Sequence, residues 1–349
     1  MVSNLARYAL AAGTLLLLPT LLLGAAFPAA TRLAVQPAHA GRDVGLVLAL
    51  NTALGIVGTI TTGFVLIPRL GVAGSLGALA FIAAVIGAVA IARSGQFRPA
   101  SMASAAMLVM VFAALAVALP RDRLATLLVD RQGGELVFFD EGPAGTVAVL
   151  EQAARSGNFR RLYIQGVSNT GDAMPSLRYM RLQSLIPLLI HPREMKSALV
   201  IGFGTGITAG ALLADPGLER RVVVELLQPV PEAAPFFAGN LGAGPDPGLE
   251  VRIGDGRHEL IRSAERYDLI TLEPPPPRAR GVVNLYSRDF SELASKRLTD
   301  GGMLAQWWPI ATQNDEDSQS LVRSMLDVFP YVSLWTTELH EMMIIGSMK

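Results

Sequence analysis

The first 120 residues of the chain consist of long apolar stretches separated by short segments that carry the charges. Four stretches have no charged side chain: Tyr8–Thr31, Val44–Pro68, Leu70–Ala92 and Pro99–Pro120. Each is about as long as the ~20 residues that a helix needs to cross a bilayer. Their glycine and alanine content suits close helix packing in lipid. The pattern therefore predicts about four transmembrane helices within residues 1–121.

Charge does not fix the orientation of these helices, because the arginines of the connecting segments divide equally between the two sides. A four-helix arrangement places Arg7, Arg69, Arg121 and Arg123 on one side and Arg32, Arg42, Arg93 and Arg98 on the other. A cleaved signal peptide ending near Ala38-His39-Ala40 is an alternative. The apolar stretch after Arg7 is too long for a signal peptide, however, and the candidate cleavage site lies well beyond its end.

After Asp122 the hydrophobic pattern changes to short segments. Glu135–Asp140, Gly145–Leu150 and Arg161–Gly166 each predict a strand, and Glu141-Gly142-Pro143-Ala144 predicts the first turn between them. We expect a small antiparallel β unit over residues 122–175.

Residues 176–349 alternate predicted helices and strands, beginning with a helix at Tyr179–Ile190. Strands are expected at Ala198–Ile201, Val222–Glu225, Leu249–Ile253, Asp268–Leu272 and Gly302–Trp307, followed by an antiparallel pair at Val332–Thr336 and Met342–Gly346. Such alternation predicts a parallel, doubly wound sheet that binds its ligand at the carboxyl ends of the strands.

The composition argues against several classes of function. The 29 basic and 29 acidic residues balance, and no basic run of the kind that follows a phosphate backbone is present. The absence of cysteine excludes disulfides and thiol catalysis, and the four histidines are scattered without metal-ligand spacing. We expect neither a nucleic-acid partner nor a metal ion.

A glycine-rich turn follows the first strand of the parallel sheet. The sequence Gly202-Phe-Gly-Thr-Gly206 comes directly after Ala198–Ile201, and a helix is predicted from Ile207 to Leu213. Glu225 ends the next apolar run, about 20 residues further on, where a carboxylate can accept hydrogen bonds from ribose hydroxyls. This arrangement predicts a nucleotide or nucleoside site.

From about Glu141 to Gly346 the order of motifs resembles the polyamine aminopropyltransferases, the spermidine synthase family, in the bacterial form that is fused to membrane helices. The matching motifs are Leu162-Tyr-Ile-Gln-Gly166, Gly202-Phe-Gly-Thr-Gly206, Glu225, Gly254-Asp-Gly256, Tyr267-Asp-Leu-Ile-Thr-Leu-Glu273, Asn284-Leu-Tyr286 with Phe290, and Gly301-Gly302 ahead of Gln306. The resemblance implies a Rossmann-like, methyltransferase-type α/β domain after the membrane helices and the β unit.

The resemblance also implies a cofactor, either decarboxylated S-adenosylmethionine or S-adenosylmethionine, and no metal. It implies that Glu225 binds the ribose and Asp255 the adenine amino group. The remaining cofactor residues that it implies are Gly202, Gly204, Thr205, Gly206, Gly256 and Asn169. The alternatives are that Asp255 caps a helix that starts near His258 and that Glu225 is a solvated strand end, but the spacing of both residues favours the nucleotide fold.

Several residues depart from the family pattern, and most of the departures remove an acid. Gln165 stands where the family usually has Asp, and Tyr179-Met180-Arg181 where it has Tyr-His-Glu, so that an arginine faces any ammonium group bound there. Asn169 replaces a usual glutamine. Glu273 and Pro274–Pro277 replace the catalytic Asp and a second Asp near it.

Glu273 keeps a carboxylate at the end of its strand and is the main catalytic candidate, with prolines that stiffen the segment after it. The alternative is that Glu273 simply ends a buried strand. Tyr286 is the second catalytic candidate, either through its hydroxyl or by packing beneath the loop, and Tyr163 and Tyr179 pose the same choice.

The leading function is aminopropyl transfer from decarboxylated S-adenosylmethionine to an amine, as in polyamine biosynthesis. Because the acids that hold a polyamine are depleted, methyl transfer from S-adenosylmethionine to an amine or lipid-associated substrate is an alternative. A second alternative is a non-catalytic nucleoside sensor or scaffold. We expect an integral protein of a bacterial inner membrane, in contact with membrane lipid, with its catalytic domain in the cytoplasm where the cofactor is supplied. A homodimer is a further expectation. The chain is either a short member of the family or a fragment of a longer protein.

Overall fold

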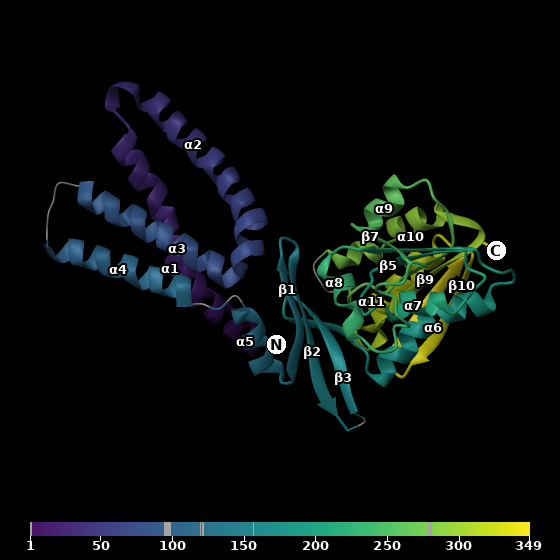
Figure 1. Cartoon of the computed structure of the whole chain (residues 1–349). Coiled ribbons are helices and arrows are strands. Elements are labelled where there is room, and N and C mark those ends of the chain that lie inside the picture. The colour runs from purple at the N-terminus through teal and green to yellow at the C-terminus, as the bar shows by residue number, and fades with distance from the viewer. Residues whose placement is uncertain (1, 94–98, 119, 121, 156, 278–280) are drawn as a thin grey trace. The chain divides into compact units, whose positions relative to one another are not determined.

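The computed structural model describes residues 2–93, 99–118, 120, 122–155, 157–277 and 281–349 (Figure 1). The chain divides into two compact units, residues 1–69 and 70–349, and each is described separately.

The first unit is helical. It contains α1 (Val2–Ala34), a 3-10 turn η1 (Pro37–His39), α2 (Ala40–Thr61) and a π-helical turn η2 (Thr62–Leu66). The next helix, α3 (Ile67–Arg93), begins at its end.

Two helical stretches among the described residues are long and apolar enough to cross a membrane, Leu5–Ala34 and Pro37–Arg93. A third crossing would come from a bent pair formed by residues 102–118 of α4 (Pro99–Ala118) and α5 (Arg123–Gln132). The predicted count of four is therefore not confirmed. The predicted break between the second and third apolar stretches appears as a backbone interruption, since Gly71 inside α3 has φ 72° and ψ 175°.

A small antiparallel sheet follows α5. Its strands are β1 (Glu135–Gly142), β2 (Gly145–Ala154), β3 (Gly157–Ile164) and β4 (Val167–Gly171), paired in that order. The sequence predicted the first three strands but neither β4 nor α5. The two faces of the sheet pack differently: Val147, Val149 and Leu162 join the main core, whereas Ala148, Leu150 and Tyr163 pack with Leu128 of α5.

The large sheet has seven strands in the order β10-β11-β9-β8-β5-β6-β7. Their bounds are β5 Ser197–Ile201, β6 Arg220–Glu225, β7 Glu250–Ile253, β8 Tyr267–Leu272, β9 Leu298–Trp308, β10 Tyr331–Glu338 and β11 Glu341–Ser347. Strands β7, β6, β5, β8 and β9 are parallel neighbours, and β11 is antiparallel to both β9 and β10. The predicted parallel sheet with a closing antiparallel pair is confirmed.

Both faces of this sheet are covered by helices (Figure 1). The helices are α6 (Met174–Ile190), α7 (Ile207–Leu213), α8 (Pro229–Glu232), α9 (Gly256–Arg262), α10 (Arg288–Ser295) and α11 (Asp315–Leu326), with 3-10 turns η3 (Ala234–Phe236), η4 (Val282–Leu285) and η5 (Ile310–Thr312). Successive residues of β5 point to opposite cores: Ala198 and Val200 to one, Leu199 and Ile201 to the other. Burial on both faces explains why the strands are continuous apolar runs.

Candidate functional site

A cavity of about 450 Å³ lies where β5, β6 and β8 end and β7 is followed by Gly254. This volume is in the range of small-molecule sites, ~300–1,000 Å³. The position is the carboxyl edge of the parallel sheet, as the sequence predicted for the ligand.

The glycine-rich turn forms one wall of the cavity. Gly202, Gly204 and Gly206 all have positive φ, at 92°, 55° and 79°. A Cβ atom built on Gly202 meets no atom within 4 Å, and one on Gly204 meets only Thr170 at 3.5 Å, so both positions leave room for a ligand to approach the backbone. Gly206 differs, because a Cβ there would lie 2.8 Å from the ring of Phe203.

Thr205 and Gly206 do not line the cavity, although the sequence grouped them with the cofactor residues. Thr205 is fully buried, and its hydroxyl lies 3.5 Å from the sulfur of Met180. Gly206 precedes the first residue of α7, and its amide donates to the carbonyl of Phe203 at 2.8 Å. Both residues therefore stabilise the turn on the side that faces away from the cavity.

Glu225, the last residue of β6, faces the cavity and is 8% exposed. Its two carboxylate oxygens accept hydrogen bonds from the amides of Phe203 at 2.8 Å and Leu227 at 2.9 Å. Burial raises the pKa of this carboxyl, and the backbone donors oppose that rise. The carboxylate faces the cavity, where a ribose hydroxyl can donate to it.

Asp255 is the helix cap that the sequence offered as one of its two roles, and it also faces the cavity. It lines the cavity, and its Oδ1 accepts from the amide of His258 at 2.8 Å as the N-cap of α9. Gly256 and Arg257 line the cavity beside it. A Cβ on Gly256 would lie 2.2 Å from the side chain of Ile201, so this position requires glycine for the close approach of α9 to β5.

The opposite wall comes from the small sheet and α6. Asn169 and Thr170 of β4 and Met180 of α6 line the cavity. The predicted cofactor residues that the structure brings together are thus Gly202, Gly204, Glu225, Asp255, Gly256 and Asn169.

Glu273 follows β8 directly and lines the cavity. Protein atoms surround its carboxyl group, which still reaches the cavity, and this burial raises its pKa to about 7. The hydroxyl of Tyr179 donates to Oε1 of Glu273 at 2.7 Å and opposes the rise. A carboxyl group with a pKa near neutrality can both accept and release a proton at physiological pH.

Tyr179 is held in turn by aromatic and acidic neighbours. Its ring stacks on Trp307 with centroids 6.3 Å apart, and the indole Nε1 of Trp307 donates to Glu341 at 2.7 Å. The charge of Glu341 also contributes to the raised pKa of Glu273. Sequence reasoning did not single out Glu341, since the only signal was an acidic turn between two apolar strands.

Tyr286 does not line the cavity. Its hydroxyl donates to the carbonyl of Pro274 at 3.2 Å and lies 3.4 Å from that of Pro275, and both prolines form part of the cavity wall. Of the two roles expected for Tyr286, this contact favours packing beneath the loop.

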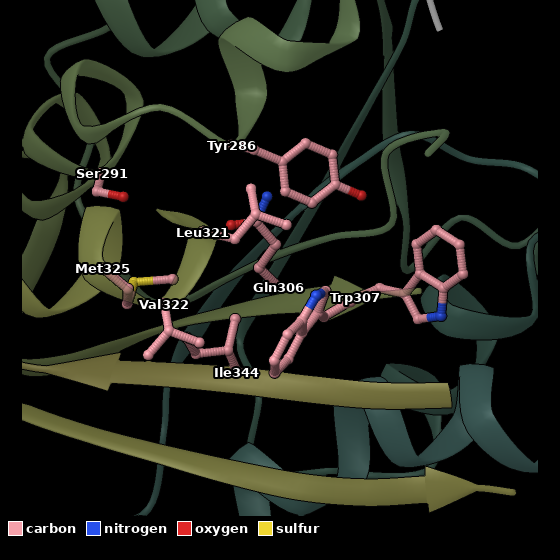
Figure 2. A pocket seen from close by; sticks show the side chains of 9 residues that line it. Tyr286, Ser291, Gln306, Trp307, Leu321, Val322, Met325 and Ile344 are labelled. Atoms are coloured by element: carbon pink, nitrogen blue, oxygen red, sulfur yellow. The ribbon is translucent and has the colours of Figure 1, made fainter. Parts of the chain in front are cut away.

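Behind Tyr286 lies a second cavity, with room for about 10 Å³ (Figure 2). That is close to the least space that one water molecule needs. Gln306 and Trp308 also line it, and the buried Nε1 of Trp308 has no hydrogen-bond partner among the described residues.

Two departures from the family pattern lie outside the main cavity. Gln165 has φ 51° and forms the turn between β3 and β4 with Gly166, so its position is set by backbone conformation. Arg181 donates to the carbonyl of Gly239 at 2.9 Å. The expectation that Arg181 faces a bound ammonium group is wrong, because its guanidinium is directed to that loop and does not line the cavity.

Comparisons with known proteins show which proteins the chain is similar to. A sequence profile described as the spermine/spermidine synthase domain matches residues 177–345. A polyamine aminopropyltransferase of Mycobacterium tuberculosis is 32% identical over 76% of this chain and 51% of its own length. The polyamine aminopropyltransferase 2 of Pseudomonas aeruginosa is 29% identical over 50% of each chain. The chain thus spans about half the length of these curated relatives.

The fold has solved counterparts. A spermidine synthase crystallised with the transition-state analogue AdoDATO superimposes with a TM-score of 0.54 at 19% identity, over 61% of this chain and 74% of the other. The spermidine synthase of Thermotoga maritima gives a TM-score of 0.52 at 18% identity, over 61% and 73%.

Proposed function

The chain belongs to the spermine/spermidine synthase family, and we propose that it transfers an aminopropyl group from decarboxylated S-adenosylmethionine to an amine. The observation that carries the proposal is Glu273: a carboxyl group with a pKa of about 7, at the carboxyl edge of the sheet, open to the cavity and held by Tyr179.

The residues of the cavity suit a nucleoside. The open side of Gly202 and Gly204 lets a ligand contact the backbone, and Glu225 offers lone pairs to a ribose. Asp255 lies at the same rim, where one carboxylate can accept from an exocyclic amine. The cofactor would supply a sulfonium, which makes the carbon beside it electrophilic.

Glu273 would act on the attacking amine. Only a neutral amine has the lone pair needed to form the new N–C bond as the C–S bond breaks, so a proton must leave the nitrogen. The ionised form of Glu273 accepts that proton, and Tyr179 stabilises the ionised form by its hydrogen bond. The products would be methylthioadenosine and the aminopropylated amine.

Methyl transfer from S-adenosylmethionine is the second candidate function. It is supported by the small number of carboxylates that line the cavity. Three carboxylates line the cavity, and the proposal above assigns Glu225 and Asp255 to the ribose and the adenine of the cofactor. Among the described residues this leaves Glu273 as the carboxylate available to the acceptor amine. A polycation has fewer anionic partners here than its charges require.

The nucleoside product separates these functions. The detergent-purified chain is incubated with each cofactor and a pool of amines and membrane extract, and products are identified by mass spectrometry. Methylthioadenosine supports aminopropyl transfer, and S-adenosylhomocysteine supports methyl transfer. Cofactor binding without either product would overturn both and favour a sensor.

We also propose that the helices before residue 122 anchor the protein in a membrane with four crossings and a cytoplasmic catalytic domain. The 57-residue stretch Pro37–Arg93 exceeds the ~20 residues of one crossing, and the interruption at Gly71 divides it into two. Resistance of the full chain to alkaline carbonate extraction tests the anchoring, and accessibility of introduced cysteines tests the count.

A further inference from the structure

A second large cavity lies on the outer face of the small sheet, away from the cavity at the sheet edge. It has a volume of about 500 Å³, and we call it the α5 groove. Its walls are Leu124, Leu127 and Arg131 of α5, and Phe139, Tyr163 and Val167 of the sheet. It shares no lining residue with the site described above.

On the side of α5, one stripe of the helix lines the groove. Leu124, Leu127 and Arg131 are spaced i, i+3, i+7 and so lie along one side of the helix. Ala125 and Leu128 are the buried residues of α5, whereas Leu124 is 38% and Leu127 47% exposed. Val167, across the groove, is 69% exposed. A concentration of exposed apolar side chains marks a binding surface.

The position of α5 in the chain indicates what covers this surface. Helix α5 begins at Arg123, shortly after the apolar helix α4 ends at Ala118. If α4 crosses the bilayer by itself and α5 is not the second half of a bent crossing, a helix that starts so soon after α4 lies at the level of the lipid headgroups. Helices at that depth bury an apolar face among acyl chains.

The charge of Arg131 indicates an anionic ligand. Arg131 is exposed at the end of the leucine stripe, and no ion pair with a carboxylate is recorded for it in the described part of the chain. A guanidinium matches a phosphate group through paired N–H donors. The groove therefore presents an apolar channel with a phosphate-binding end.

We propose that the α5 groove binds one anionic phospholipid, with its phosphate at Arg131 and an acyl chain along Leu124 and Leu127. The proposal rests on the membrane anchoring proposed above and does not depend on the reaction. It gives the small sheet a role in holding the catalytic domain at the membrane surface.

The test uses the full chain in phosphatidylcholine vesicles that contain a phosphatidylglycerol probe with a photoreactive acyl chain. Peptides labelled after illumination are mapped by mass spectrometry. We expect label on the peptides of α5 and of the turn between β3 and β4. Arg131→Gln should reduce that label about fivefold, since one basic residue near an anionic surface contributes ~1 kcal/mol. Leu127→Gln should reduce it as well, while Arg155→Gln, at an exposed arginine of the turn that follows β2, should not.

Three outcomes would overturn the proposal: no label on α5 while the apolar helices are labelled, label that Arg131→Gln leaves unchanged, or a cross-link between α5 helices of two chains without lipid label. If alkaline carbonate instead releases the unmutated chain from the vesicles, the proposed membrane anchoring is refuted. Thermal unfolding of each variant shows that loss of label does not come from misfolding.

Discussion

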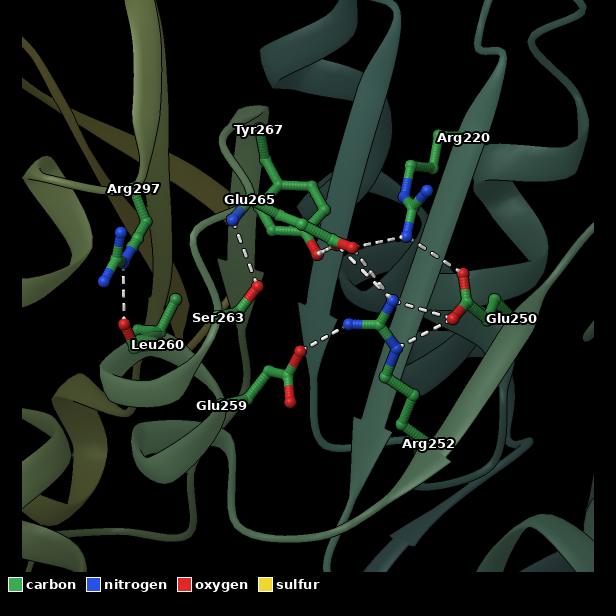
Figure 3. A network of polar contacts seen from close by, with 9 residues as sticks. All are labelled: Arg220, Glu250, Arg252, Glu259, Leu260, Ser263, Glu265, Tyr267 and Arg297. Atoms are coloured by element: carbon green, nitrogen blue, oxygen red, sulfur yellow. Dashed lines mark hydrogen bonds and ion pairs between the residues drawn. The ribbon is translucent and has the colours of Figure 1, made fainter.

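Two clusters of carboxylates lie at opposite ends of the same parallel sheet, and their surroundings differ. At the amino ends of the strands, Glu250 and Glu265 form ion pairs with both Arg220 and Arg252, and Glu259 pairs with Arg252 (Figure 3). At the carboxyl ends, Glu225, Asp255 and Glu273 have no ion pair with lysine or arginine among the described residues.

The pKa values follow this difference. The hydroxyl of Tyr267 and the two guanidinium groups hold the pKa of Glu265 below its ordinary value. Burial raises the pKa of both Glu225 and Glu273. A carboxylate whose charge is cancelled by neighbours stabilises the fold, whereas one that is buried without a cationic partner is available to a positively charged ligand. The variants below each change one residue of the two clusters or one of their hydrogen-bond partners.

The largest effect is expected from Glu273→Gln. The amide cannot accept a proton from the amine, so turnover should fall by about 10²–10⁴-fold, the range that general-base catalysis supplies. Cofactor affinity, measured by calorimetry, should stay within about twofold of the parent value. Glu338→Gln is the control, because Glu338 pairs with Arg178 away from the cavity lining. Unchanged turnover in Glu273→Gln would show that Glu273 is not the general base.

Glu225→Gln should act on binding rather than on chemistry. An amide provides one acceptor oxygen for the two backbone donors, Phe203 and Leu227, and has no charge to offer a ribose. A hydrogen bond to a charged group contributes ~1.5–3 kcal/mol, so its loss should weaken the affinity for the cofactor by about 10–100-fold. Calorimetry with each cofactor measures the change, and Glu232→Gln, at an exposed position, serves as the matched control. Equal affinity in the two variants would contradict a ribose-binding role.

Tyr179→Phe should shift the pH dependence of the reaction. Tyr179 donates to the ionised form of Glu273 and keeps its pKa from rising further, so removal of the hydroxyl raises that pKa above about 7. Less of the base is then ionised at neutral pH. We expect activity several-fold below the parent at pH 7 that recovers as the pH is raised. A uniform loss at every pH would mean that Tyr179 acts in another way.

The sequence predicted the sheet and the cavity wall that contains Gly202, Glu225 and Asp255, because both depend on local patterns. Apolar runs buried on both faces determine the strands, and glycines with positive φ determine the turn. The pattern of glycines does not tell which of them face the ligand, however. Gly206 was grouped with Gly202 for this reason, although the ring of Phe203 occupies the space beside it.

The surroundings of Glu273 were harder to predict because their contacts join distant segments. Tyr163 and Tyr179 are equivalent in the sequence, yet one is buried beneath α5 and the other bonds to Glu273, 94 positions away. Gln165 illustrates the converse, since a motif position that suggests chemistry proves to be a turn residue. Motif positions give residue types but no side-chain directions, and the direction depends on tertiary packing.

The smallest effect is expected at the opposite end of the sheet. Arg252→Ala removes the cation shared by Glu250, Glu259 and Glu265 and should lower the stability by about 1 kcal/mol at pH 7, the scale of partly exposed ion-pair networks. The three tryptophans, all beyond residue 300, report thermal unfolding of this domain in detergent. Because the folded-state pKa of Glu265 is lowered, its contribution is present above its ordinary pKa and is lost as the pH falls. The difference between variant and parent should therefore shrink in acid, with kcat/KM unchanged at neutral pH. A loss of activity without a loss of stability would show that the two ends of the sheet are coupled, and that the paired cluster is more than a structural support.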